Sequence, residues 1–300
     1  MSSFLILGGV TYDTIVSMKE FPKAEPATLH AHGFHETVGS TGAGKALCLH
    51  KLGTETTLLA TAGDDEYGRK IRRFLEQEGL SFHLDHDPTG TERHVNLMDE
   101  NGGRISIFLN TSSVDAKLDL ERTKELLQKS DYAVLNIVGY CKQYIPLLQE
   151  LGKEVWCDLH DYDGRNTFHD GFIAASHYLF LSSDNLPDYR PLMEQWIREG
   201  KKLVVCTHGR NGATALTPDG QWLEIPIIEQ YERVDSNGAG DNFFAGFLYA
   251  HSLGCSLPTC LRAAAVTAGL CVTSKELVAE GLSAAKLHED YEKYYGEKLL

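Results

Sequence analysis

The chain has 300 residues, of which 42% are hydrophobic and 23% are charged, a composition typical of an ordinary globular protein. Lysine and arginine number 28 against 42 aspartates and glutamates, and the net charge of −14 argues against nucleic acid or an anionic membrane as the main partner. No apolar run approaches the ~18 residues of a membrane span. The seven cysteines lack Cys-x-x-Cys spacing, which predicts reduced thiols in a cytoplasmic protein.

Short apolar runs rich in β-branched residues alternate with longer amphipathic ones. The first run lacks a basic leader and predicts a buried strand rather than a signal peptide. Strand character covers residues 4–7, 57–61, 133–138, 154–157, 178–181 and 203–206. Helical spacing covers residues 43–52, 67–78, 121–129, 144–151, 189–198, 242–251, 257–273 and 283–294. This alternation predicts an α/β fold of three layers, in which helices cover both faces of a mostly parallel sheet.

Two segments break the alternation. Residues 12–35 are extended in character and are interrupted by Pro22 and Pro26, and residues 91–109 carry Asn101-Gly102-Gly103 between two runs with strand character, a strong hairpin signal. Strands with no helix between them do not join a parallel sheet easily. We therefore expect one domain over residues 1–300, with a small β-sheet lid formed from about 12–37 and 91–110.

A glycine-containing run near residue 240 is the most informative part of the chain. Asn237-Gly238-Ala239-Gly240 leads into Asp241 and then into an apolar helical stretch. Glycines let successive N–H groups point into one space, and a helix N-terminus adds its positive end, which together favour an anion. A carboxylate beside an anion site suggests phosphoryl transfer. Alternatively, Asp241 only caps the helix.

Residues 235–247 read Asp-Ser-Asn-Gly-Ala-Gly-Asp-Asn-Phe-Phe-Ala-Gly-Phe. They resemble the second signature, D-T-x-G-A-G-D-x-F-x-x-G-F, of the ribokinase-like (PfkB-type) family of carbohydrate and nucleoside kinases. Residues 39–46 resemble its glycine-rich first signature, near G-G-x-G-x-N-x-A. The resemblance covers nearly the whole chain. It implies the ribokinase-like fold and ATP-dependent transfer of the γ-phosphoryl group to a hydroxyl of a sugar, a nucleoside or a related polyol, with Mg²⁺.

The resemblance also implies roles for the second signature. Asp241 would be the base that accepts the proton of the acceptor hydroxyl. The migrating phosphate would receive backbone N–H groups from Gly238, Ala239 and Gly240. Asp235 matches a position that holds a monovalent cation such as K⁺ in some members; stabilising a turn is its alternative role.

The resemblance places three residues at the site of the acceptor substrate. Gly42 and Gly44 lie in the first signature, where Gly44 replaces an asparagine that commonly touches the acceptor and Ser40 replaces a glycine. Asp13 follows the first strand, where an aspartate of the family commonly accepts hydrogen bonds from acceptor hydroxyls. The alternative for Asp13 is a solvated turn carboxylate.

The nucleotide side is implied by residues 207–212. They resemble the family's T-x-G-x-x-G loop, which places Thr207, Gly209 and Gly212 at ATP; the alternative is a plain hairpin into residues 213–217. The family's N-x-x-E is replaced by Ser182-Ser183-Asp184-Asn185. Mg²⁺ would then be held by Asp184, by ATP and water, or with help from the acidic loop 158–163.

Two further patterns resemble known sites. Gly39-x-x-x-x-Gly44-Lys45 matches most of the Walker A pattern, but Ala46 stands where Ser or Thr should bind Mg²⁺, so we interpret Lys45 as a helix-face residue near the substrate. The residues His30-x-His32-x-x-His35 have metal-like spacing. On a strand the first two histidines would face away from the third, so we expect no structural metal there.

A second functional hypothesis is a homologue that binds ligand without catalysis, as a sensor or scaffold. The departures at Gly44, Ser182 and Asn185 favour it, whereas the intact run ending at Asp241 favours the enzyme. The exposed edge of the expected lid sheet also predicts a homodimer through the lid.

Overall fold

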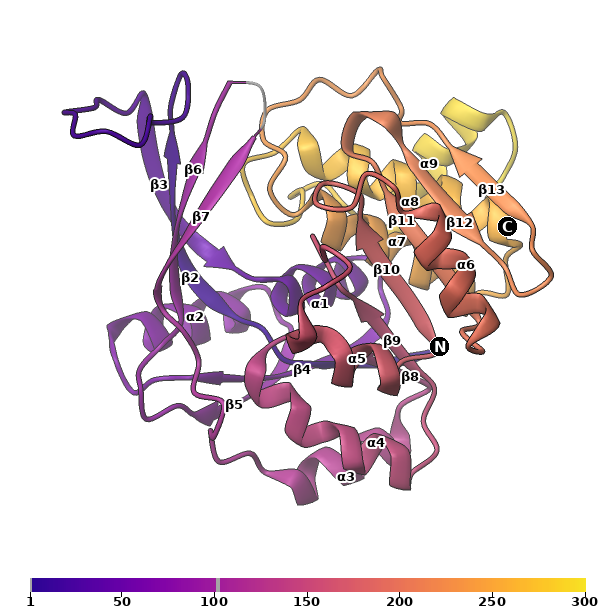
Figure 1. Cartoon of the computed structure of the whole chain (residues 1–300), viewed down its shortest axis with the longest axis horizontal. Coiled ribbons are helices and arrows are strands. Elements are labelled where there is room, and N and C mark those ends of the chain that lie inside the picture. Colours follow the sequence, from indigo (N-terminus) through magenta and orange to yellow (C-terminus); the bar gives the residue numbers. More distant parts are fainter. Residues whose placement is uncertain (1, 101–102) are drawn as a thin grey trace.

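A computed structural model describes residues 2–100 and 103–300 of the chain and contains two sheets (Figure 1). The large sheet has nine strands in the order β13-β12-β11-β10-β9-β8-β1-β4-β5, and the small sheet has four in the order β3-β2-β6-β7. The large sheet comprises β1 (Ser3–Leu7), β4 (Glu55–Ala62), β5 (Ser81–His86), β8 (Tyr132–Leu135), β9 (Val155–Asp158), β10 (Tyr178–Ser182), β11 (Leu203–Thr207), β12 (Ala213–Leu216) and β13 (Trp222–Ile225). The small sheet comprises β2 (Thr11–Ser17), β3 (Gly33–Gly39), β6 (Arg93–Met98) and β7 (Arg104–Asn110).

Helices lie on both faces of the large sheet. They are α1 (Thr41–Lys51), α2 (Glu66–Gln77), α3 (Leu120–Lys129), α4 (Ile145–Glu150), α5 (Asp170–Ala175), α6 (Arg190–Arg198), α7 (Ala239–Ser252), α8 (Leu257–Val272) and α9 (Ala284–Tyr295). The large sheet is parallel from β5 to β11, and β12 and β13 extend it antiparallel. Parallel neighbours need a crossover, which the helices supply, whereas β11 and β12 are joined by a hairpin.

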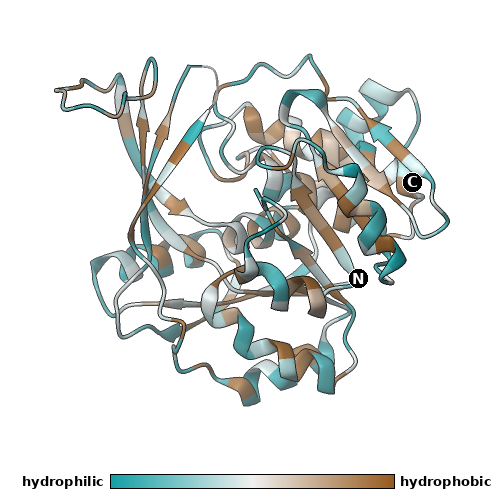
Figure 2. Ribbon diagram, in the orientation of Figure 1, coloured by the Kyte–Doolittle hydropathy of each residue, from teal (hydrophilic) through white to brown (hydrophobic). Residues whose placement is uncertain are grey.

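The core follows from the alternation of side chains along each strand. On β1, Phe4 and Ile6 pack into the cluster beneath α1, α2, α7, α8 and α9, whereas Leu5 and Leu7 pack into the cluster beneath α3, α4, α5 and α6. A strand buried on both faces reads as a continuous apolar run, as β1 does. In Figure 2 hydrophobic residues line the strands and the helix sides that face them. The predicted fold class is confirmed.

The structure differs from the expected elements where polar side chains intervene. The strand expected over 133–138 ends at Leu135, where the side chain of Asn136 donates to the carbonyls of Leu7 and Gly8. The elements β5, β13 and α5 were not expected. β5 alternates apolar and polar residues because it is an edge strand with one face half-exposed.

The small sheet is mixed. β2 pairs antiparallel with β3 and parallel with β6, and β6 pairs antiparallel with β7. The turn expected at 101–103 joins β6 to β7, but its residues 101–102 lie outside the described residues. The C-terminal end of β3 continues through Gly39 and Ser40 directly into α1. The small sheet is therefore covalently connected to the first helix of the core.

Among the described residues, no helix is both long and apolar enough to cross a lipid bilayer. All seven cysteines are free thiols, and Cys255 is the one that is partly exposed.

Ser40, which connects β3 to α1, provides a test of backbone strain at this connection. Its φ of 79° and ψ of 153° are essentially a glycine conformation, which costs another residue about 1–3 kcal/mol. Glycine gains back about 0.5–1 kcal/mol of freedom in the unfolded chain. We therefore expect Ser40→Gly to raise the free energy of unfolding by about 1 kcal/mol in urea denaturation.

A matched control is Ser256→Gly, at the N-cap of α8 with φ of −64°. It should lower the free energy of unfolding by a few tenths of a kcal/mol. A loss of stability in Ser40→Gly equal to that in Ser256→Gly would contradict the strain.

Candidate active site

The N-terminus of α7 begins with a glycine that no other residue could replace without strain. Gly238 has a φ of +80°, and a Cβ on it would lie 2.7 Å from the carbonyl oxygen of Leu277. The buried side chain of Asn242 fixes this turn by donating to the carbonyls of Gly238 (2.9 Å) and Leu277 (3.0 Å). The packing beneath the turn therefore sets the direction of the first amides of α7.

The first amides of a helix have no acceptor within the helix. The amide of Ala239 donates weakly to Ser236 O, at 3.3 Å. Gly240 is exposed, and a Cβ on it would meet open space. The first turn of α7 thus faces solvent at Gly240, whereas the N–H of Ala239 already has a protein partner.

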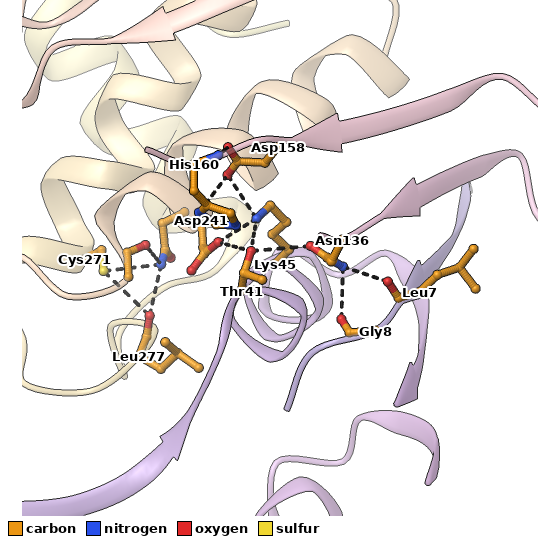
Figure 3. A network of polar contacts seen from close by, with 12 residues as sticks. Leu7, Gly8, Thr41, Lys45, Asn136, Asp158, His160, Asp241, Cys271 and Leu277 are labelled. Atoms are coloured by element: carbon orange, nitrogen blue, oxygen red, sulfur yellow. Dashed lines mark hydrogen bonds and ion pairs between the residues drawn. The ribbon is translucent and has the colours of Figure 1, made fainter. Parts of the chain in front are cut away.

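A buried ammonium lies beside Asp241 (Figure 3). The side chain of Lys45, from α1, has no exposed surface, and its Nζ lies 2.6 Å from Asp241 Oδ1 and 3.1 Å from Asp158 Oδ2. Burial disfavours the charged ammonium, but the two carboxylates raise the pKa of Lys45 above its ordinary value. Although burial opposes the charge of Asp158, His160 and Lys45 hold the pKa of that carboxyl below its ordinary value.

A chain of hydrogen bonds connects this ion pair to the end of β1. Thr41 Oγ1 receives a hydrogen bond from Lys45 and donates to Asp241 Oδ1 at 2.7 Å. Thr41 also lies 3.4 Å from Asn136 Oδ1, and Asn136 in turn donates to the carbonyl of Gly8 at 3.0 Å. Figure 3 shows that these contacts link α1, α7 and the carboxyl ends of β1, β8 and β9.

The glycines of α1 allow this close approach. A Cβ on Gly42 would overlap the carbonyl oxygen of Gly8, so the start of α1 packs directly on the turn after β1. A Cβ on Gly44 would lie 3.2 Å from Asp241 Oδ2. The structure therefore places Gly44 against the Asp241 carboxylate, and Gly42 against the backbone.

Among the described residues, one group has ligand atoms close enough together to hold a metal ion. It consists of Asp158, His160 and Asp241, whose ligand atoms all lie within 4.8 Å of one another. The ammonium of Lys45 already bridges the two carboxylates, and Mg²⁺ prefers oxygen ligands to imidazole. These three residues therefore do not fit Mg²⁺. The histidines at 30–35 do not form such a group.

Asp13 is buried on β2, with 4% of its surface exposed. Its Oδ2 accepts from Asn96 Nδ2 at 3.2 Å, whereas its buried Oδ1 has no hydrogen-bond partner and lies 3.7 Å from His94 Nδ1. Burial raises the pKa of the Asp13 carboxyl, and His94 opposes this rise. A buried carboxylate oxygen without a donor is costly, so Asp13 is not a solvated turn residue. Its Oδ1 is closed to solvent, and His94 is its ion-pair neighbour.

The remaining expected residues lie in turns. Asp235 Oδ1 accepts from the amide of Asn237 at 2.8 Å, which stabilises the turn before Gly238. Gly209 and Gly212 have positive φ in the turn between β11 and β12, which is a hairpin, and Thr207 ends β11.

A cavity of about 580 Å³ lies beside this hairpin. Its wall includes His208, which contacts Ser183 Oγ through Nδ1 (3.0 Å) and Thr214 Oγ1 through Nε2 (2.9 Å) and whose ring lies 4.5 Å from that of Tyr189. Burial lowers the pKa of His208 and favours the neutral imidazole. An aromatic wall with hydroxyl groups suits a heterocyclic base.

The structure brings together three side chains, Lys45, Asp158 and Thr41, whose mutual contacts the sequence did not predict. Lys45 was expected on a helix face near the substrate, Asp158 in a loop, and Thr41 not at all. The one signal in the sequence is the spacing Thr41-x-x-x-Lys45, which puts both side chains on one helix face.

Comparisons with known proteins agree with this architecture. The profile of the pfkB family carbohydrate kinases matches residues 1–161 and 175–283. An acarbose 7(IV)-phosphotransferase from Actinoplanes sp. is 32% identical over 291 residues, which cover 94% of this chain and 96% of that protein. A ribokinase from Arabidopsis thaliana is 26% identical over 90% of this chain and 76% of its own.

Solved structures give the same result. A microbiome-derived acarbose kinase superposes with a TM-score of 0.85 at 28% identity, covering 97% of this chain and 99% of that one. A Burkholderia thailandensis nucleoside kinase in complex with inosine shares the fold, with a TM-score of 0.84 at 19% identity over 98% of this chain and 99% of its own. The chain belongs to the PfkB family of carbohydrate kinases and is a phosphotransferase with an alcohol group as acceptor.

Proposed function

We propose that the chain transfers the γ-phosphoryl group of ATP to a carbohydrate hydroxyl, with Asp241 as the base. One observation carries this proposal: the Asp241 carboxylate lies at the N-terminus of α7, 2.6 Å from the buried Lys45 ammonium and beside amides that favour an anion. The acceptor oxygen attacks the γ-phosphorus, the bond to the β,γ-bridging oxygen breaks, ADP leaves, and the proton of the hydroxyl passes to Asp241.

The backbone amides of residues 238–240 are proposed to support the transferring phosphoryl group, and Ala239 would give up its weak hydrogen bond to Ser236 O for this role. Among them Gly240 is the most open, and a neutral donor there stabilises negative charge without a countercharge. Bound Mg²⁺ would neutralise the phosphates of ATP. The exposed carboxylate of Asp184 is the group we propose to hold Mg²⁺, together with ATP and water, because Asp158 and Asp241 are bridged by Lys45.

The nucleotide is proposed to bind along the hairpin of residues 207–212. Thr207, Gly209 and Gly212 would lie by the phosphates and ribose, and the neighbouring cavity at His208 and Tyr189 would take the adenine. A monovalent cation near Asp235 and a cytoplasmic location remain predictions.

The acceptor is proposed to be a sugar or oligosaccharide-like polyol. Relatives named acarbose 7(IV)-phosphotransferase and acarbose kinase are 32% and 28% identical to the chain. The orphan oxygen of Asp13 is suited to a sugar hydroxyl, because a charged acceptor strengthens such a bond. Gly42 and Gly44 would line the acceptor's approach to Asp241.

We also propose that the small sheet is a lid over the acceptor. One contact supports this: Arg104 Nη1 of β7 donates to Asn237 Oδ1 at 3.1 Å, directly before Gly238. The lid would thereby touch the loop that positions the phosphoryl group, and its closure would keep water away from ATP.

The proposed base is tested with Asp241→Asn. We expect the turnover number to fall about 10²–10⁴-fold, because an amide cannot accept the proton. The measurement is ADP release over a panel of acarbose, maltose, ribose, fructoselysine and inosine. Glu194→Gln, on the exposed surface of α6, is the control and should match the wild type.

Two outcomes would count against this assignment. A turnover of Asp241→Asn close to that of the wild type would remove the residue from the mechanism. Wild-type protein that binds ATP but phosphorylates no member of the panel would favour the sensor or scaffold.

Asp13→Asn tests the acceptor contact. Loss of the charge should raise the KM for the acceptor about 10–100-fold, because hydrogen bonds to a charged group are stronger than hydrogen bonds to a neutral one. Because the folded protein holds the proton of Asp13 more tightly than the unfolded chain, the charged form destabilises the fold above the ordinary pKa of 3.8. The variant should therefore be more stable than the wild type at pH 7 in urea.

That gain in stability should shrink as the pH is lowered towards 3.8. The exposed Asp115→Asn variant is the control and should change neither KM nor stability. An unchanged KM in Asp13→Asn would exclude the acceptor contact.

The homodimer is proposed to form through β7, the edge strand of the small sheet. Ile105 and Ile107 share one face of this strand, and with Phe108 and Leu109 they are 39–57% exposed. A free edge with an apolar face can pair with a second copy. We expect a dimer in sedimentation at micromolar concentration and a monomer for Ile107→Lys, while Leu120→Lys on α3 leaves the dimer intact. A wild-type monomer at all concentrations would contradict this.

A further inference from the structure

The contact between the small sheet and Asn237 brings an exposed cation to the start of α7. Arg104 of β7 donates from Nη1 to Asn237 Oδ1 at 3.1 Å, and the next residue is Gly238, the N-cap of α7. We propose that Arg104 is a catalytic residue, whose guanidinium contacts the transferring phosphoryl group at this helix N-terminus. This inference rests on the proposed function, which places that group at residues 238–240.

The buried cation of the site is already used by other groups. Lys45 Nζ contacts Asp241 at 2.6 Å and Asp158 at 3.1 Å, and its side chain has no exposed surface. Its third hydrogen reaches the hydroxyl of Thr41. One ammonium therefore balances two carboxylates, and a phosphoryl group that enters beside them adds further negative charge. A guanidinium at the start of α7 would offset that charge where it develops.

The register of β7 places Arg104 on the sheet face that carries the proposed acceptor contact. Side chains two residues apart on a strand share a face, so Arg104 lies on the same face as Ser106, which is paired with Asn96 of β6. Ser106 donates to Asn96 Oδ1 at 2.6 Å, and Asn96 donates to Asp13 Oδ2 at 3.2 Å. One face of the small sheet thus carries a row of polar side chains from Asp13 to Arg104. It can contact the acceptor at one end and the phosphoryl group at the other.

A guanidinium is chemically suited to this role. It stays charged in proteins, and its planar fork of N–H donors matches two oxygens of a phosphoryl group. Arg104 is exposed, and its hydrogen bond to Asn237 uses one of five N–H donors. Arg104 keeps all its protons during the transfer: the acceptor oxygen bonds to phosphorus, the bond to the β,γ-bridging oxygen breaks, and Asp241 takes the hydroxyl proton. The guanidinium contributes only charge stabilisation.

A structural latch is the other account of the same contact. As a latch, Arg104 would hold the small sheet against the loop before α7, and the side chain of Asn237 would be as necessary as the guanidinium. As a phosphoryl ligand, Arg104 would keep its role without that side chain. Removal of the Asn237 side chain therefore separates the two accounts.

The test measures kcat and KM by ADP release over the acceptor panel used for Asp241→Asn. In Arg104→Gln the turnover number should fall about 10²–10³-fold with an unchanged KM for the acceptor, because the lost contact is strongest in the transition state. Arg104→Lys should recover part of this loss, since it restores the charge but not the fork. Asn237→Ala should lose much less than Arg104→Gln. The control Arg198→Gln, on the exposed surface of α6, should match the wild type.

A second measurement does not need turnover. Tetrafluoroaluminate mimics a transferring phosphoryl group, and calorimetry compares the affinity of the protein for ADP with and without this anion. The anion should tighten the binding of ADP to the wild type. In Arg104→Gln this gain should be about 10–100-fold smaller, as expected for the loss of a hydrogen bond between charged groups. ADP alone should bind equally to both proteins.

The outcomes separate this inference from the proposed function. A turnover number of Arg104→Gln no lower than that of Asn237→Ala would overturn the role of Arg104, and so would an equal gain from tetrafluoroaluminate in the wild type and Arg104→Gln. Wild-type protein with no kinase activity would instead contradict the proposed function. The calorimetry would still decide in that case whether Arg104 contacts a phosphoryl group.

Discussion

The ion pairs of one buried ammonium hold three distant parts of the chain together. Lys45 of α1 meets Asp158 at the end of β9 and Asp241 at the start of α7, and its side chain has no exposed surface. Removing one partner of such a group costs about 3–5 kcal/mol, because an uncompensated charge stays buried. The elements are therefore fixed to one another by a charge balance as well as by apolar packing. The proposed base belongs to the core and not to a mobile loop.

Close backbone approach makes this arrangement possible. The start of α1 packs on the turn after β1 because Gly42 has no side chain to meet the carbonyl of Gly8, and the turn before α7 fits under Leu277 because Gly238 adopts a positive φ. Both turns lie at the carboxyl ends of parallel strands, where open α/β sheets leave a crevice for ligands. The glycines thus bring two helix N-termini to the same crevice, and side chains from each can meet there.

The sequence predicts the fold well because alternation of strands and helices is a local signal. It fails where the signal is weak: β5 alternates polar and apolar residues, and Asn136 ends a strand within an apolar run. The glycine run before Asp241 could also be found, because its residues are contiguous. The contact of Lys45 with Asp241 spans 196 positions and depends on how α1 and α7 pack, which no local pattern reports. The structure was needed to show that a Walker-like lysine is paired with carboxylates.

The proposed acceptor contact and the proposed base belong to different sheets of this molecule. Asp13, His94 and Asn96 belong to the small sheet, whereas Lys45 and Asp241 belong to helices packed on the large one. The small sheet joins the core covalently from β1 into β2 and from β3 through Gly39 and Ser40 into α1, and Arg104 of β7 donates to Asn237 before α7. This division gives a physical reason why relatives named for acarbose, ribose and nucleosides share one fold. In the proposed mechanism, polar groups of the small sheet face the acceptor, whereas the carboxylate of Asp241 and the N-terminus of α7 act on its hydroxyl.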